Sequence, residues 1–173
     1  MTRPLRPSPN PSPEGEGERQ KLVAFAEASI AKGSKSFAAA SRLFDRTTRE
    51  RVWLLYAWCR ACDDLADGQD HGGAMGFVDD AAARMDYMRL TTRQALAGKV
   101  VDDPPFDALR IVAAETGLTQ SQADAVLDGF ALDADEWRPR SVDDLYRYCY
   151  HVAGAVGVMM AVVMGVPADE EAT

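Results

Sequence analysis

Apolar residues recur at helical spacing along most of this chain, and no convincing stretch alternates as a half-buried strand would. Alanine is abundant and runs of β-branched residues are few, which favours helix over sheet. Glycine, proline and capping residues divide the pattern into expected helices at 22–31, 35–43, 48–67, 75–97, 105–116, 119–137 and 142–165. The sequence therefore predicts an all-α domain of antiparallel helices joined by short loops.

Two segments bear on domain limits and on membranes. Residues 1–19 are rich in Pro, Ser, Gly and Glu and lack the apolar core of a targeting signal, so we expect a disordered tail before a domain at 20–173. The longest apolar run, 152–166, is shorter than the about 20 residues that a spanning helix needs. It is therefore predicted to be a buried core helix.

Charge and cysteine content narrow the class of protein. A net charge of −8 argues against a nucleic-acid surface, although a metal ion can bridge acidic side chains to a phosphorylated ligand. Cys59, Cys62 and Cys149 are odd in number, which favours a reducing cytoplasm over a disulfide framework. Cys59 and Cys62 form a C-x-x-C without a second pair, so they are interpreted as small core residues rather than zinc ligands.

The segment at 56–67 carries the clearest chemical signal. Tyr56, Arg60, Asp63 and Asp67 are spaced by four, three and four residues, which places them on one helix face. Val52 continues that face upstream as an apolar position. The carboxylates of Asp63, Asp64 and Asp67 lie in the last turns, where the helix dipole disfavours anions. A divalent cation such as Mg²⁺ would reverse this balance; the alternative is a solvated acidic helix end.

Three other segments add to this signal. Gly33-Ser-Lys-Ser-Phe37 offers free N–H groups, two hydroxyls and an ammonium for an anion, or simply a helix break with a capping serine. Gly129 lies in a helix before an acidic stretch that includes Asp133, and suits the close approach of another backbone or a ligand. The segment Tyr148 to Gly157 combines the polar ends of tyrosine and histidine side chains with small residues. This combination permits either close helix packing or an apolar cavity with a polar entrance.

In this order the segments at 33–37, 56–67 and 148–157 resemble those of the squalene/phytoene synthase family, most like its bacterial phytoene synthases. The resemblance runs from about residue 22 to residue 166. It implies an isoprenoid-synthase helical fold and Mg²⁺-dependent head-to-head joining of two geranylgeranyl diphosphates, with Mn²⁺ as an alternative metal and no NADPH. It further implies ionisation of one substrate, alkylation of the other, a cyclopropyl intermediate, and loss of a proton to give phytoene.

Residue roles follow from the same resemblance. Asp63 and Asp67 are expected to bind Mg²⁺ directly, and Asp64 is expected to assist them without contacting the metal. Tyr148 is expected to steer the cationic steps, and Asp133 to belong to the substrate site. The diphosphate-binding positions are Arg60, Ser34, Lys35 and Ser36, and the cavity-lining positions are Phe37, Tyr56 and Ala153.

The chain departs from the family pattern in one respect. The family carries a second aspartate-rich motif on a later helix, and none occurs before Thr173, so about half of the catalytic domain is expected here and the piece is expected to be inactive alone. The alternatives are a squalene or hydroxysqualene synthase, a non-catalytic helical relative, and a four-helix carboxylate metal protein, which would usually show Glu-x-x-His pairs. The expected location is the cytoplasm, with peripheral contact at the inner membrane surface when a lipid product leaves.

Overall fold

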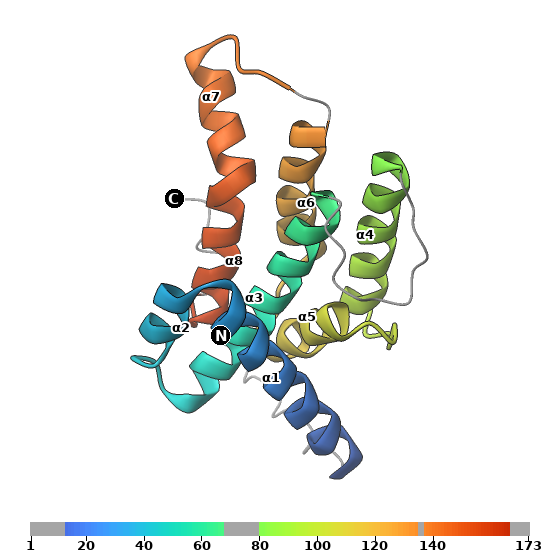
Figure 1. Cartoon of the computed structure of the whole chain (residues 1–173), viewed down its shortest axis with the longest axis vertical. Coiled ribbons are helices and arrows are strands. Elements are labelled where there is room, and N and C mark those ends of the chain that lie inside the picture. Colours follow the sequence, from blue (N-terminus) through green and yellow to red (C-terminus); the bar gives the residue numbers. More distant parts are fainter. Residues whose placement is uncertain (1–12, 68–79, 135–136, 167–173) are drawn as a thin grey trace, which may run out of the picture.

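The computed structural model describes residues 13–67, 80–134 and 137–166, and this part of the chain is helical without strands (Figure 1). The elements are α1 (Pro13–Gly33), α2 (Lys35–Ser41), α3 (Arg46–Ala66), α4 (Ala81–Leu96), α5 (Pro104–Thr116), α6 (Gln120–Ala134), α7 (Val142–Cys149), the π-helical segment η1 (Tyr150–Gly154) and α8 (Ala155–Val163). The all-α prediction is confirmed.

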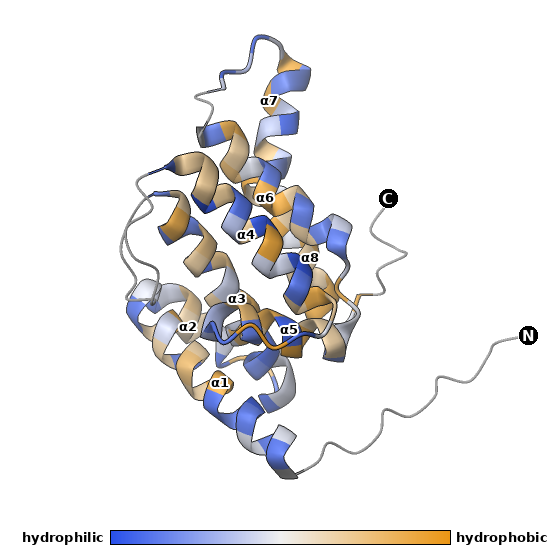
Figure 2. Cartoon of the chain, turned by 90° about the vertical axis from the view of Figure 1, so that its right-hand side faces the viewer, coloured by the Kyte–Doolittle hydropathy of each residue, from blue (hydrophilic) through white to orange (hydrophobic). Residues whose placement is uncertain are grey.

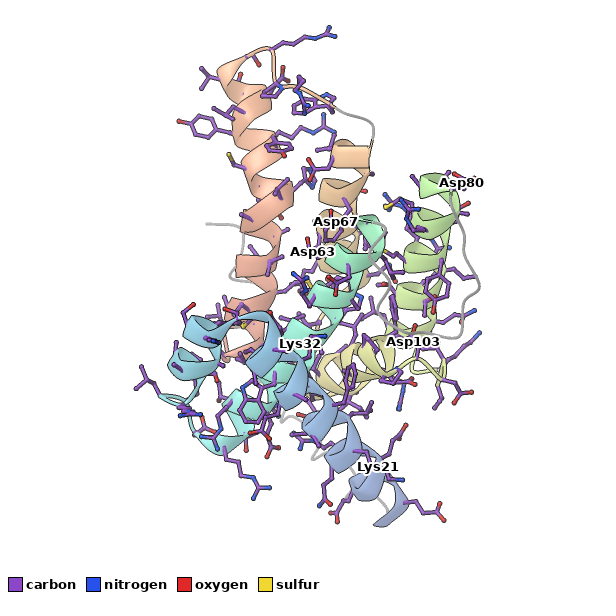
Figure 3. All side chains as sticks on the ribbon, viewed as in Figure 1. Lys21, Lys32, Asp63, Asp67, Asp80 and Asp103 are labelled. Carbon is purple, nitrogen blue, oxygen red and sulfur yellow. The ribbon has the colours of Figure 1, made fainter. Side chains whose placement is uncertain are left out.

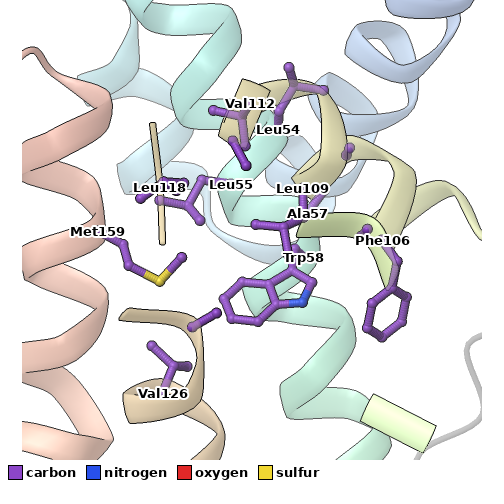
Figure 4. Packing of buried hydrophobic residues seen from close by; sticks show 14 of the residues in the cluster. Leu54, Leu55, Ala57, Trp58, Phe106, Leu109, Val112, Leu118, Val126 and Met159 are labelled. Atoms are coloured by element: carbon purple, nitrogen blue, oxygen red, sulfur yellow. The ribbon is translucent and has the colours of Figure 1, made fainter. Parts of the chain in front are cut away.

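Helix α3 lies at the centre of the arrangement. It packs against α1, α4, α5, α6 and α8, while α6 also contacts α4 and α8. The core closes around Trp58 of α3, which is fully buried with Phe106 and Met159 from two other helices (Figure 4). The indole Nε1–H of Trp58 donates a 3.1 Å hydrogen bond to Thr92 Oγ1 of α4, so this buried donor is satisfied.

Several helices begin where capping residues stand in the sequence. Ser34 caps α2 by accepting from the Phe37 backbone N–H, as predicted, and Asp45 caps α3 through the Thr48 backbone N–H. Asp80 and Ser141 do the same for α4 and α7. Gly117 follows α5 with φ 80°, a left-handed conformation that glycine adopts without strain.

The prediction of a disordered tail over 1–19 is wrong for residues 13–19, which form the first turns of α1. Residues 1–12 lie outside the described residues. Figure 2 shows these turns as mostly hydrophilic, which is why apolar periodicity missed them. They are held by ion pairs instead: Arg19 bonds Glu50 and Glu115, each at 2.6 Å, and Glu18 pairs with Arg110.

The remaining helix boundaries differ by small amounts. The start expected at 75 and residues 135–136 fall outside the described residues, and Trp137 lies beyond the end of α6. The helix expected at 142–165 is α7, η1 and α8 in succession, forming one rod (Figure 1). The π-helical segment at its centre is a local widening of the kind often found at functional positions.

Gly129 lies where α6 meets this π-helical segment. A Cβ atom at Gly129 would stand 2.7 Å from the carbonyl oxygen of His151 and 2.9 Å from its carbonyl carbon. The close backbone approach expected at this glycine is therefore confirmed, and His151 Nδ1 lies 2.8 Å from the Ala125 carbonyl oxygen on the same interface.

The apolar run 152–166 is only partly a core helix. Ala155, Met159, Val162 and Val163 are buried, whereas α7 has no buried residue. The exposed large apolar residues of this rod and its end are Val142, Leu145, Tyr146, Tyr150, Val152, Met164 and Val166. Among the described residues, none of the helices has the length and apolar character needed to cross a bilayer.

The cysteine interpretation is confirmed for Cys62, which is buried in the core, and Cys59 packs against the core half-buried. Burial raises the pKa of the Cys59 thiol to about 12 and raises that of Cys62 well above its ordinary value. Thiols in such surroundings stay protonated and make poor metal ligands.

Candidate functional site

The face of α3 that the sequence singles out runs from the hydrophobic core to the protein surface at the C-terminal end of the helix. Val52 is fully buried, Tyr56 and Arg60 are half-buried, and Asp67 is exposed where it caps the C-terminal end of α3. Figure 3 shows Asp63 and Asp67 one above the other near that end. The helix therefore brings two carboxylates to the surface along a stripe that begins in the hydrophobic core.

Arg60 is held between two aspartates. Its Nη1 lies 3.0 Å from Asp63 Oδ2 and its Nη2 lies 2.5 Å from Asp64 Oδ1. The Asp64 side chain is 2% exposed and that of Asp63 is 47% exposed. Asp64 is thus a buried anchor for the guanidinium, whereas Asp63 remains accessible to solvent and to ligands.

The field around Asp63 disfavours its negative charge. Partial burial raises the pKa of Asp63 above its ordinary value; Asp67 and Asp64 raise it further, and Arg60 opposes the shift. The C-terminal end of α3 adds the negative end of the helix dipole. A cation bound between Asp63 and Asp67 would offset the repulsion of the Asp63 charge by Asp67, by Asp64 and by the negative end of the helix dipole.

The donor set fits a metal that needs few protein ligands. Within the described ranges no group of three or more His, Cys, Asp or Glu side chains gathers as a potential metal centre. Asp63 and Asp67 nevertheless provide the one or two carboxylates through which Mg²⁺ is often held, with water and substrate phosphates completing its shell. A zinc or calcium centre built from protein groups alone would need more ligands.

The predicted anion-binding segment is fixed against α3. Ser41 Oγ accepts a 2.9 Å hydrogen bond from Trp53 Nε1, and the rings of Phe37 and Tyr56 meet at 5.8 Å with a 52° tilt. A Cβ atom at Gly33 would clash with the Tyr56 hydroxyl, so a larger residue there would require the Tyr56 side chain to move. These contacts bring Ser34 to the helix that carries Arg60, with Lys35 and Ser36 exposed beside it.

A second group of predicted residues lies on α6 and α7. The Tyr148 hydroxyl donates a 2.7 Å hydrogen bond to Asp133 Oδ1, and Trp137 stacks on the Tyr148 ring at 6.1 Å. This hydrogen bond to a carboxylate is the main reason that the pKa of Tyr148 is raised. Ala153 is exposed in the π-helical segment that follows. The predicted residues thus fall into two groups, one on α2 and α3 and one on α6, α7 and η1.

Sequence reasoning missed the recess beside Arg60. A pocket of about 430 Å³ lies between α1 and α3, and Lys32 and Ser29 of α1 line it together with Arg60. Neither α1 residue belongs to a recognisable motif. The available signal was Lys32 standing directly before the 33–37 segment.

Comparison with known proteins adds sequence and fold relationships. The sequence model of the squalene/phytoene synthase family matches residues 30–173. The chain is 47% identical over 147 residues to a phytoene synthase of Pseudescherichia vulneris and 45% identical over 147 residues to a 15-cis-phytoene synthase of Pantoea ananas. Each alignment covers 84% of this chain and 48% of the relative, so the chain spans about half the length of the curated relatives it matches.

Solved structures agree on the fold. A dehydrosqualene synthase in complex with ligand superposes with a TM-score of 0.72 at 33% identity, covering 85% of this chain and 48% of that one. The squalene synthase HpnC from Alicyclobacillus acidocaldarius superposes with a TM-score of 0.74 at 24% identity, covering 89% and 55%. The match of the family model over residues 30–173 and the similarity of the folds together place the chain in the squalene/phytoene synthase family.

Proposed function

We propose that the chain is the part of a phytoene synthase that supplies one carboxylate pair of the metal site and one share of the diphosphate-binding surface. The observation that carries this proposal is the 45–47% identity to bacterial phytoene synthases over nearly the whole described region. The exposed pair Asp63 and Asp67 beside Arg60 supports it.

The roles of the residues follow from their positions. Asp63 and Asp67 would hold Mg²⁺ or Mn²⁺, which supplies Lewis acidity for departure of the diphosphate. Arg60, kept in place by Asp64, would offer charge-assisted hydrogen bonds to the phosphate oxygens. Ser34, Lys35 and Ser36 at the start of α2 would be further donors. Departure of the diphosphate with the electron pair of its C–O bond leaves an allylic cation that must be kept dry.

The remaining predicted residues would shape the apolar space. Phe37 and Tyr56 pack ring against ring where α2 meets α3, and Ala153 adds a small side chain on the π-helical segment. Tyr148 donates a hydrogen bond to Asp133, which would orient its phenol oxygen at the polar end of this space. The proposed substrates are two molecules of geranylgeranyl diphosphate, with no NADPH, and the apolar product would leave through peripheral membrane contact.

The test is a hybrid enzyme in which residues 20–166 replace the matching half of the Pseudescherichia vulneris phytoene synthase. With geranylgeranyl diphosphate and Mg²⁺ the hybrid should form phytoene without NADPH, detected by chromatography. The Asp63→Asn hybrid is the control that should lose the product while remaining folded. A folded hybrid without product would refute the proposal.

A squalene-type synthase is the second candidate, favoured by the 33% identity to the solved dehydrosqualene synthase. The same hybrid separates the two functions when it is given farnesyl diphosphate with and without NADPH. Preference for farnesyl diphosphate, or a product that requires NADPH, would assign the second function.

A further inference from the structure

The recess between α1 and α3 has a lining that is basic in an otherwise acidic chain. Its volume is about 430 Å³, and it is lined by Phe25, Ala28, Ser29, Lys32, Gly33 and Arg60. Two of these side chains are cations and none is a carboxylate, although the whole chain has a net charge of −8. The side chains that line the recess therefore favour an anion over a cation.

Lys32 is available to a ligand. It is exposed in the last turn of α1, and in the described part of the chain it has no ion-pair partner. By contrast, Arg19, Arg51 and Arg110 are each paired with glutamates or aspartates. A lysine in a last turn stabilises the helix through its dipole. This role in the helix does not explain why Lys32 lies in the same recess as Arg60.

Arg60 connects the recess to the candidate metal site. Its Nη2 is tied to the buried Asp64 and its Nη1 contacts the accessible Asp63. A guanidinium has five N–H donors, so these contacts leave others for an anion. Gly33 continues the recess toward Ser34, the first hydroxyl of the 33–37 segment. Figure 3 shows Lys32 at the end of α1 on the side where Asp63 and Asp67 stand on α3.

We infer that Lys32 is a further diphosphate-binding residue, acting with Arg60 in this recess. The inference rests on the proposed function and extends it to a side chain of α1. A diphosphate carries several negative oxygens, which suits two cations and the Ser29 hydroxyl. Lys32 contributes a strongly hydrated point charge and no fixed fork, so it adds affinity while Arg60 sets orientation.

The experiment measures binding of inorganic pyrophosphate to the whole 173-residue chain by titration calorimetry, with and without Mg²⁺. Lys32→Ala should weaken pyrophosphate binding about tenfold, as expected for the loss of one charge-assisted hydrogen bond. Lys32→Arg should retain most of the affinity. Lys21→Ala is the matched control, because it removes the same charge about three helical turns earlier on α1, away from the recess (Figure 3).

Equal affinities for the Lys32→Ala and Lys21→Ala chains would overturn the inference, as would a wild-type chain that binds no pyrophosphate under either condition. The outcome is separable from that of the proposed function. A hybrid that makes phytoene while Lys32→Ala binds pyrophosphate normally refutes only the role of Lys32. A folded hybrid without product, together with a specific Lys32 effect, refutes only the phytoene synthase proposal.

Discussion

At the scale of single residues, neighbouring aspartates of α3 have different physical tasks. Asp64 is buried and tied to Arg60, whereas Asp63 is accessible and lies one turn before Asp67. Successive residues of a helix are about 100° apart, so the sequence predicts which aspartates share a face. It does not predict which of them are buried. We therefore expect a change at Asp64 to affect folding, and we propose that a change at Asp63 affects metal binding.

We expect Asp64→Asn to lower the free energy of unfolding by about 1–3 kcal/mol, because it weakens the charge-assisted contact with Arg60 at a side chain that is only 2% exposed. Asp63→Asn should slightly stabilise the protein at pH 7. The pKa of Asp63 is raised in the folded state, so its ionisation disfavours folding as the pH rises above the ordinary value of 3.8. Below that pH the gain should vanish.

Urea unfolding at pH 7 and pH 3 measures both effects. A Mn²⁺ titration followed by electron paramagnetic resonance should show weaker binding for Asp63→Asn and Asp67→Asn than for Asp64→Asn. Equal weakening at all three positions would contradict the separation of roles.

Gly129 provides a prediction about packing. Gly129→Ala should lower the free energy of unfolding by about 1–3 kcal/mol, since the new methyl group would meet the backbone of His151 and α6 would have to move from the rod. Gly157→Ala on α8 is the matched control. A Cβ there meets nothing within 4 Å, so alanine should be neutral or stabilise the helix by about 0.5–1 kcal/mol. The prediction fails if urea unfolding gives the two variants the same sign.

At the scale of elements, α1 illustrates how charge can replace apolar burial. Its first turns are hydrophilic, yet Arg19 joins Glu50 of α3 to Glu115 of α5. Burial would raise the pKa values of both glutamates, but hydrogen bonds from the arginines outweigh it and hold them below the ordinary 4.5. The first turns of α1 are thereby part of the folded domain.

This arrangement predicts a pH dependence. Glutamates with lowered folded-state pKa values stabilise the fold fully above about pH 4.5, and the contribution is lost as the pH falls through their folded-state values. Arg19→Met should lower the free energy of unfolding at pH 7 by about 1–3 kcal/mol and make it less dependent on pH below 4.5. Lys21→Met serves as the control. A loss for Arg19→Met that is equally large at pH 7 and pH 3 would contradict this account.

At the scale of the whole molecule, the rod of α7, η1 and α8 is covered on one side only. Residue Tyr146 is 70% exposed, Leu145 and Tyr150 are each 47% exposed, and no residue of α7 is buried. Apolar patches of this kind are typical of surfaces that bind another surface. The described residues also contain only one carboxylate pair at the candidate metal site, with no larger cluster of metal ligands.

The 173-residue chain tested by itself should therefore form no phytoene from geranylgeranyl diphosphate and Mg²⁺, and should be only marginally stable. Its thermal unfolding should be broad, and it should bind a hydrophobic dye. Calorimetry, size-exclusion chromatography and product analysis test this, with the hybrid enzyme as the positive control. A sharp transition, a clean monomer and measurable phytoene would contradict the prediction.

The sequence by itself determined the class of fold and the family, and it predicted which residues carry the chemistry. Helical periodicity and capping residues such as Ser34 are local properties, and the spacing of Arg60, Asp63 and Asp67 is fixed by helix geometry alone. Motif order was sufficient to identify the family, because the segments at 33–37, 56–67 and 148–157 are specific in combination. Gly129 could also be singled out locally, since a glycine inside a helix has a cost that some contact must offset.

Only the tertiary structure decided which of these residues meet and which are buried. The ion pairs of Arg19 join residues far apart in sequence, so no local pattern predicts that α1 begins at Pro13. The recess that Lys32 shares with Arg60 depends on how α1 crosses α3, and the burial of Asp64 depends on how the other helices pack around α3. Contacts between helices are set by packing of whole surfaces, and the spacing of residues along one helix carries no information about its neighbour.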